Sequence, residues 1–163
     1  SLQCTLRYDR LVDAGLPLMP GARALLQDLR GADVPIAIAT STVRERAEVK
    51  LARSGIAGFF DVVVTRSDVA KAKPAPDAYL LAARRLGLPP SVCLALEDSE
   101  LGVRAAAAAG MRVVQVPDLV PSSELSRSLA QVVGSLEQAR PLLQSLLGIA
   151  LPARAETTPC DLA

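Results

Sequence analysis

Apolar and polar positions along the chain follow two patterns, which together predict strands alternating with helices. Short, mainly apolar runs, typical of strands covered on both faces, occupy 34–39, 60–65, 92–96, 112–116 and 132–133. Between these runs apolar residues recur at helical spacing, as at Ala22, Leu25, Leu26 and Leu29. This alternation favours a three-layer α/β fold, in which a parallel sheet is covered by helices on both faces.

Capping residues, prolines and glycines set the expected helix boundaries. The predicted helices span 22–29, 43–53, 76–86, 103–109, 122–130 and 135–148. Thr42 and Glu45 have the spacing of a capping box at the start of the second of these helices. Ser135 and Gln138 have the corresponding spacing at the start of the last one. The segment 149–163 is rich in breakers and is expected to be a flexible tail.

The composition is that of one ordinary globular domain, and it narrows the classes of partner. Of 163 residues, 50% are hydrophobic and 21% charged, with 18 basic residues against 17 acidic ones. With 2% aromatic residues and no basic stripe, the chain is not expected to bind nucleic acid. The longest uncharged run, 141–153, is too short to span a bilayer. Three scattered cysteines favour neither a disulfide framework nor a metal motif, and a reducing cytoplasm is the expected location.

Two adjacent carboxylates, Glu97 and Asp98, follow the strand predicted at 92–96. Side chains at the carboxyl end of a parallel strand point into the crevice where open α/β sheets bind ligands. Because the chain contains no histidine, two acids at this place favour a hard cation such as Mg²⁺ over zinc. The alternative is a solvated turn in which Asp98 or Ser99 caps the next helix.

Two further features lie at predicted strand ends. Thr40 and Ser41 stand between a strand and a helix start, where hydroxyls and backbone N–H groups can hold a phosphate. Lys73 precedes two prolines, and a positive charge on so stiff a loop suits a transferring phosphoryl group. The alternatives are a helix cap for Thr40 and a solvated surface charge for Lys73. Lys71 is less constrained and is treated as a bystander.

The order and spacing of these features carry a specific resemblance. The segments IAIATS (36–41), KPAPD (73–77) and LEDSELG (96–102), followed by AAAAAGM (105–111), resemble the haloacid dehalogenase-like (HAD) hydrolase superfamily. Within it, the chain is most similar to the branch that contains phosphatases and β-phosphoglucomutase. The similarity runs from about residue 16 to residue 119. It implies a Rossmann-like core and a small phosphorylated metabolite as substrate.

The resemblance also implies roles for the residues that match the motifs. Thr40, with Ser41 beside it, would hydrogen-bond the transferring phosphoryl group. Lys73 would neutralise the developing charge and orient the nucleophile. Asp98, with Glu97, would hold Mg²⁺ directly or through water. In such enzymes an aspartate attacks phosphorus, and water then hydrolyses the aspartyl-phosphate.

The Asp-x-Asp block that carries this nucleophile in the family has no counterpart here. The resemblance therefore implies that the block lies upstream of Ser1, on the first and central strand of the sheet. Residues 1–18 would be the remnant of a helical cap domain, 19–148 the core and 149–163 the tail. Without the central strand, the 163-residue piece alone is expected to be unstable and inactive.

Two alternatives to an Mg²⁺-dependent phosphomonoester hydrolase remain open. A sugar-phosphate mutase would use the same three features and a fourth, Gly102, whose missing side chain could allow close packing of helix and strand. A truncated homologue without catalysis would instead act as a binding or regulatory protein.

Overall fold

The computed structural model describes residues 18–153, and they form parallel strands alternating with helices. The strands are β1 (Ala37–Ala39), β2 (Val62–Val64), β3 (Leu94–Glu97), β4 (Arg112–Gln115) and β5 (Gln131–Val132). The α-helices are α2 (Ala22–Gly31), α3 (Arg44–Ser54), α4 (Asp77–Leu86), α5 (Glu100–Ala108), α6 (Glu124–Leu129) and α7 (Leu136–Leu147). Short 3₁₀ turns are η1 (Ala57–Phe59), η2 (Arg66–Asp68) and η3 (Pro90–Val92). The predicted parallel α/β architecture is confirmed.

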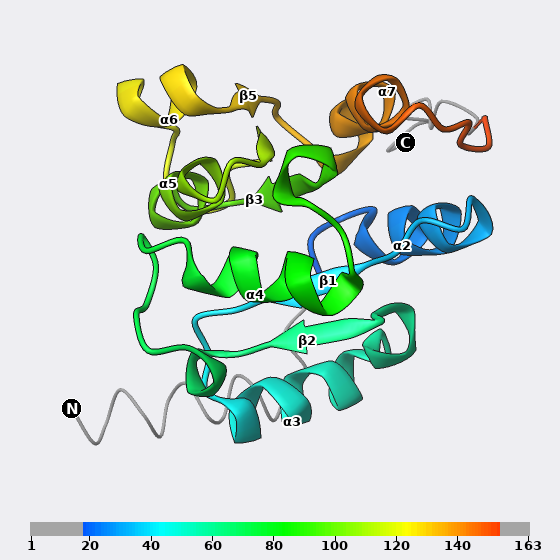
Figure 1. Cartoon of the computed structure of the whole chain (residues 1–163). Helices are drawn as coiled ribbons and strands as arrows, with labels where there is room; N and C mark the ends of the chain where they lie inside the picture. Colours follow the sequence, from blue (N-terminus) through cyan, green and yellow to red (C-terminus); the bar gives the residue numbers. More distant parts are fainter. Residues whose placement is uncertain (1–17, 154–163) are drawn as a thin grey trace, which may run out of the picture.

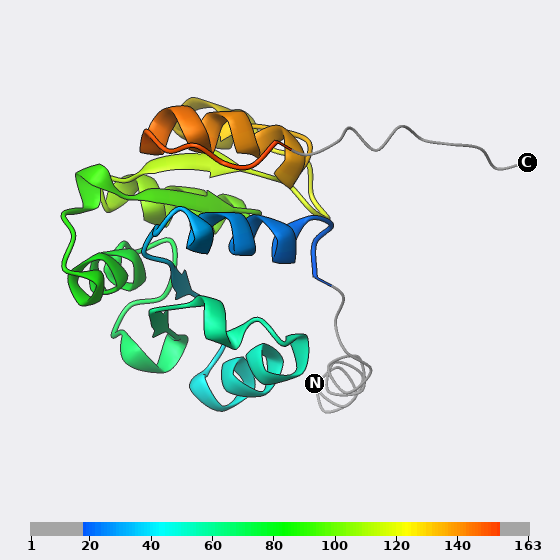
Figure 2. The same cartoon turned by 90° about the vertical axis from the view of Figure 1, so that its right-hand side faces the viewer.

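The strands form two sheets rather than one. β1 pairs with β2, Ala37 opposite Val62, while β3, β4 and β5 form a second parallel sheet in that order. Figures 1 and 2 show the two-stranded sheet, with α3, in one half of the molecule and the three-stranded sheet, with α6 and α7, in the other. Within the described residues, β1 and β3 are therefore edge strands of separate sheets.

The three-stranded sheet is covered on both faces, because successive residues of its strands point to opposite sides. Val114 of β4 packs with Leu29 of α2 and Leu143 of α7. Its neighbour Val113 packs instead with Val103 of α5 and with Tyr79 of α4. A third cluster joins α4 to the two-stranded sheet through Val64, Ala78 and Ala82. Helix α4 therefore bridges the two sheets.

The first strand is shorter than the run at 34–39 predicts, and a side chain explains why. The Asp61 carboxylate accepts a hydrogen bond from Ile36 N at 2.9 Å, while Asp61 N donates to Ile36 O at 2.8 Å. Asp61 thus occupies the place of a ladder partner, and β1 begins at Ala37. The carboxylate also pairs with Arg30 on α2.

The helix caps agree with the sequence at two places and differ at a third. Ser135 caps α7 by accepting from Gln138 N, as predicted, and Ser99 caps α5 by accepting from Gly102 N. The capping box expected from Thr42 and Glu45 is wrong, because α3 begins after Val43 without a side-chain cap of its own. Its first N–H, that of Arg44, donates instead to Ser67 Oγ in the loop after β2.

The tail expected from 149 onward does not begin there. Leu151 is buried in the same cluster as α2 and α7, and Ile149 packs against that cluster. The carbonyl of Pro152 accepts a hydrogen bond from Arg140, which is itself paired with Asp28 of α2. Residues 149–152 are therefore part of the core. Of the predicted cap remnant at 1–18, residues 1–17 lie outside the described residues, as does the end of the tail, 154–163.

Among the helices of residues 18–153, none has the length and apolarity that a membrane crossing requires.

Candidate active site

The loop after β2 carries Lys73 from the two-stranded sheet to the end of β3. There the Lys73 ammonium donates to Glu97 Oε1, and the two side chains are only 10% and 7% exposed. The sequence predicts the lysine-proline loop and the paired acids at strand ends, and the structure brings these two features together. A buried ion pair has lost its hydration, so its partners must satisfy each other closely.

Tyr79 of α4 joins this pair, and sequence reasoning missed it. Its hydroxyl donates to Glu97 Oε1 and accepts from Lys73 Nζ at 3.1 Å. The ammonium also lies 4.7 Å from the centre of the phenol ring, within cation–π distance. Burial, reinforced by the Glu97 charge, raises the pKa of Tyr79 well above its usual range, so the phenol remains a donor. We call Lys73, Tyr79 and Glu97 the Glu97 cluster.

Gly102 leaves the room that the Glu97 carboxylate occupies. A Cβ at position 102 would lie 1.9 Å from Glu97 Oε2 and 2.3 Å from Oε1. The carboxylate thus rests directly on the first turn of α5. Ser99 lies beside it and donates to Oε2 at 3.3 Å. The sequence predicted close helix–strand packing at this glycine, and the structure shows a carboxylate filling the space.

Asp98 is held by its backbone rather than by its side chain. Its carbonyl accepts from Gln115 Nε2 at 3.2 Å, and Ser122 Oγ donates to Gln115 Oε1 at 2.8 Å. Partial burial and the neighbouring Glu97 charge raise the pKa of Asp98. Within residues 18–153 its carboxylate forms no ion pair, so a second negative charge stands beside Glu97 without a cation of its own.

These two carboxylates suit a divalent cation that prefers oxygen ligands. Within the described part of the chain, no group of three or more His, Cys, Asp or Glu side chains is placed to hold a metal ion. Glu97 and Asp98 would therefore supply part of a ligand set, with water or other groups completing it.

Thr40 and Ser41 follow β1, as predicted. Thr40 N donates to Val64 O at 2.9 Å and continues the pairing with β2, while its Oγ1 accepts from Thr42 N at 3.1 Å. Ser41 is exposed. Among the described residues, neither is hydrogen-bonded to Lys73 or Glu97. The structure thus joins Lys73 to Glu97 and leaves Thr40 and Ser41 on a separate loop.

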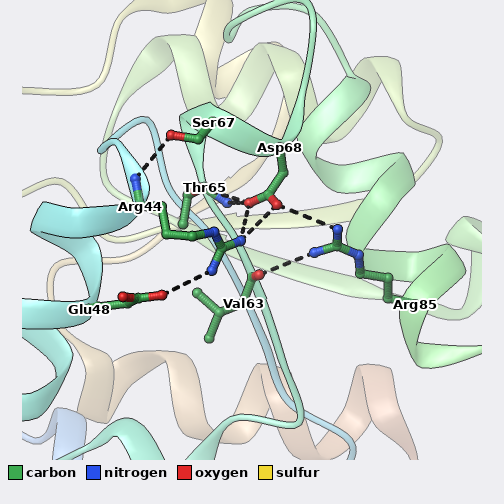
Figure 3. A network of polar contacts seen from close by, with 7 residues as sticks. All are labelled: Arg44, Glu48, Val63, Thr65, Ser67, Asp68 and Arg85. Atoms are coloured by element: carbon green, nitrogen blue, oxygen red, sulfur yellow. Dashed lines mark hydrogen bonds and ion pairs between the residues drawn. The ribbon is translucent and has the colours of Figure 1, made fainter.

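A second polar network links the start of α3 to the loop after β2, which carries Lys73 (Figure 3). Arg44 Nη2 donates to both oxygens of Asp68, at 2.7 and 2.6 Å, and Thr65 donates to Asp68 through its N–H and its hydroxyl. Arg85 of α4 approaches Asp68 at 3.5 Å and donates to Val63 O at 3.3 Å. Hydrogen bonds from Arg44, the larger cause, and from Thr65 hold the pKa of Asp68 far below its usual range. We call Arg44, Thr65, Asp68 and Arg85 the Asp68 network.

The sequence of this chain matches the model of a known family over most of its length. The haloacid dehalogenase-like hydrolase model aligns with residues 2–110, which include Thr40, Lys73, Glu97 and Asp98. The chain belongs to this family. The resemblance drawn from the three motifs is therefore confirmed, whereas Gln115 and Ser122, which support the Asp98 backbone, lie beyond the matched residues.

Relatives in the HAD family include phosphatases and a sugar-bisphosphate complex. The chain is 45% identical over 130 residues to a probable pseudouridine-5'-phosphatase of Drosophila melanogaster, which covers 76% of this chain and 56% of that protein. It is 42% identical over 126 residues to hexitol phosphatase A of Escherichia coli, again covering 76% and 56%. The structure resembles CbbY of Rhodobacter sphaeroides in complex with xylulose-1,5-bisphosphate, with 33% identity and a TM-score of 0.70 over 78% of this chain and 60% of the other. The chain spans little more than half the length of these curated relatives.

Proposed function

We propose that this chain is the phosphate-handling part of a HAD-family phosphatase that hydrolyses a small phosphorylated metabolite with Mg²⁺. The buried Lys73–Glu97 contact beside the unpaired Asp98 carboxylate carries the proposal. It brings one positive and two negative groups to the end of β3. A dianionic phosphoryl group would find the ammonium there, and a cation would find the carboxylates.

Each residue at these strand ends has a role in the proposal. Lys73 neutralises charge on the phosphoryl oxygens and orients the attacking carboxylate. Thr40 and Ser41 donate hydrogen bonds to phosphoryl oxygens, for which the exposed Ser41 hydroxyl is available. Asp98, with Glu97, would hold Mg²⁺, which when bound would offset negative charge on the transferring group.

The attacking aspartate of the proposal lies on a strand outside these 163 residues. Because β1 and β3 are edge strands of separate sheets bridged by α4, a further parallel strand between them would complete one sheet. Such a strand would end beside Lys73 and Glu97. A helical cap domain would precede residue 18, and on this proposal the 163 residues alone are inactive.

The names of relatives support a proposal for the substrate class. Their names specify pseudouridine 5'-phosphate and hexitol phosphates, and one solved relative holds a ketose bisphosphate. We propose that the substrate is a phosphorylated sugar or nucleoside of similar size, and that the enzyme acts on it in the cytoplasm.

The test is phosphate release by the complete gene product from a panel of phosphomonoesters, with and without Mg²⁺. Lys73→Ala should lower kcat by about 10²–10³-fold, since it removes the cation from the transferring group. Lys71→Ala is the matched control, because Lys71 is exposed on the same loop and should leave kcat unchanged. Equal effects of the two substitutions, or release that ignores Mg²⁺, would contradict the proposal. Phosphoryl transfer between two positions of a sugar, without net release, would favour a mutase.

A further inference from the structure

We propose that Tyr79 is a positioning residue that holds the Glu97 carboxylate in its Mg²⁺-binding orientation; this inference rests on the proposed function. Nothing in the three sequence motifs points to it. The inference comes from the contacts of the phenol with both charged partners at the end of β3.

The two oxygens of Glu97 have different surroundings. Oε1 takes both strong donors, the Lys73 ammonium and the Tyr79 hydroxyl. Oε2 accepts only from Ser99, at 3.3 Å, among the hydrogen bonds of the described residues. The two donors therefore occupy Oε1, while Oε2, with one long hydrogen bond, keeps the acceptor capacity that a cation would use.

Tyr79 and Gly102 confine the carboxylate from two different elements. The phenol comes from α4 and is itself only 7% exposed, so it cannot swing away without opening the core. The absent side chain at position 102 places the α5 backbone directly against both oxygens. A carboxylate confined in this way is pre-organised, and little conformational entropy remains to be lost when a ligand binds.

The hydroxyl adds something that Lys73 cannot supply. A second ammonium near Glu97 would repel Mg²⁺, whereas a phenol donates a hydrogen bond and brings no net charge. The ring separately supports Lys73 from 4.7 Å. Tyr79→Phe keeps the ring over the ammonium and deletes only the bond to Glu97, so it isolates the role of the hydroxyl.

The experiment is calorimetric titration of the complete gene product with Mg²⁺ alone. Tyr79→Phe should weaken Mg²⁺ binding by about 10-fold, the lower end of what loss of a partner to a metal ligand costs. The substrate KM at saturating Mg²⁺ should stay unchanged, and kcat there should recover to within a few-fold. The matched control is Thr65→Val, which also deletes a fully buried hydroxyl that donates to a carboxylate, that of Asp68. Thr65→Val should lower the melting temperature without changing the Mg²⁺ affinity.

A second variant approaches the same carboxylate from the opposite side. Gly102→Ala must displace Glu97, and it should weaken Mg²⁺ binding as Tyr79→Phe does. Wild-type Mg²⁺ affinity in a folded Tyr79→Phe protein, or in Gly102→Ala if the former does not fold, would overturn the inference and leave the phosphatase proposal standing. A wild-type protein that neither binds Mg²⁺ nor releases phosphate would overturn both.

Discussion

The Glu97 cluster at the end of β3 and the Asp68 network after β2 each surround a carboxylate with hydrogen-bond donors, yet they differ in what they leave unsatisfied. Arg44 Nη2 donates to both oxygens of Asp68, and Thr65 donates through its N–H and its hydroxyl. Arg85 lies 3.5 Å from Asp68. The pKa of Asp68 is lowered accordingly. At the end of β3, one ammonium and one phenol donate hydrogen bonds to Glu97. Partial burial and the charge of Glu97 raise the pKa of the adjacent Asp98.

On the proposed function, this difference separates a structural carboxylate from metal-binding ones. The Asp68 network is complete within the described residues, and it ties α3, the loop after β2 and α4 together. The end of β3 keeps an excess of negative charge that a bound cation would relieve. Acidic residues at strand ends are thus not equivalent, and the surplus charge, rather than the residue type, indicates where a metal would bind.

The largest expected contrast is catalytic. Asp98→Asn should lower Mg²⁺-dependent phosphate release by the complete gene product by about 10²–10³-fold, because it removes a proposed metal ligand. Its melting temperature should hardly fall, since the carboxylate makes no ion pair within residues 18–153. Asp68→Asn is the matched change in the other region and should retain most of the activity. If Asp68→Asn abolished activity and Asp98→Asn did not, the assignment of the two regions would be reversed.

The next contrast is in stability. Asp68→Asn weakens charge-assisted bonds to Arg44 and to the Thr65 backbone, and it should lower the melting temperature by about 6 °C. Differential scanning calorimetry of the two aspartate variants side by side measures this. If Asp98→Asn lowered the melting temperature as much as Asp68→Asn does, the two regions would not differ in their contribution to stability.

Low pH should destabilise the folded protein through the same Asp68 network. Because the folded-state pKa of Asp68 lies below its unfolded value, its contribution to stability is fully present above about pH 4 and is lost as the pH falls through the folded-state value. The wild-type protein should therefore lose stability between about pH 4 and pH 2 more steeply than Asp68→Asn does. Parallel curves in urea melts across this range would show that Asp68 contributes nothing to acid sensitivity.

The smallest expected effect is at Arg85. Its contact with Asp68 is 3.5 Å long and its side chain is 42% exposed, so Arg85→Ala should change the melting temperature by about 2 °C or less. Arg44→Ala, which removes the shorter contact, should destabilise more. An Arg85→Ala effect larger than that of Arg44→Ala would mean that Arg85, and not Arg44, is the main cation of the Asp68 network.

The sequence predicted the elements well where local signals act. Helix α4 begins at Asp77 and ends at Leu86 as expected from its proline and glycine boundaries, and Ser135 caps α7. Lys73 lies beside Glu97 as the motifs indicate. Each of these depends on residues close together in sequence or on a recognisable motif.

Most of what was missed depends on distant residues. The Tyr79–Glu97 bond joins positions 18 apart, and it exists because α4 presents that face of its first turn to β3. The Arg44 guanidinium contacts Asp68 across 24 positions. The backbone N–H of Arg44 donates to Ser67 Oγ, although the sequence predicted a local cap at Thr42. Only Thr65 and Asp68 had a local signal, because their spacing is that of a capping box.

The most direct test of the account is a crystal structure of the complete gene product with Mg²⁺ and inorganic phosphate. We predict the ion on Asp98 and Glu97, the phosphate against Lys73, Thr40 and Ser41, and a parallel strand between β1 and β3 that ends in an aspartate. Direct pairing of β1 with β3, or an ion bound away from both carboxylates, would contradict it.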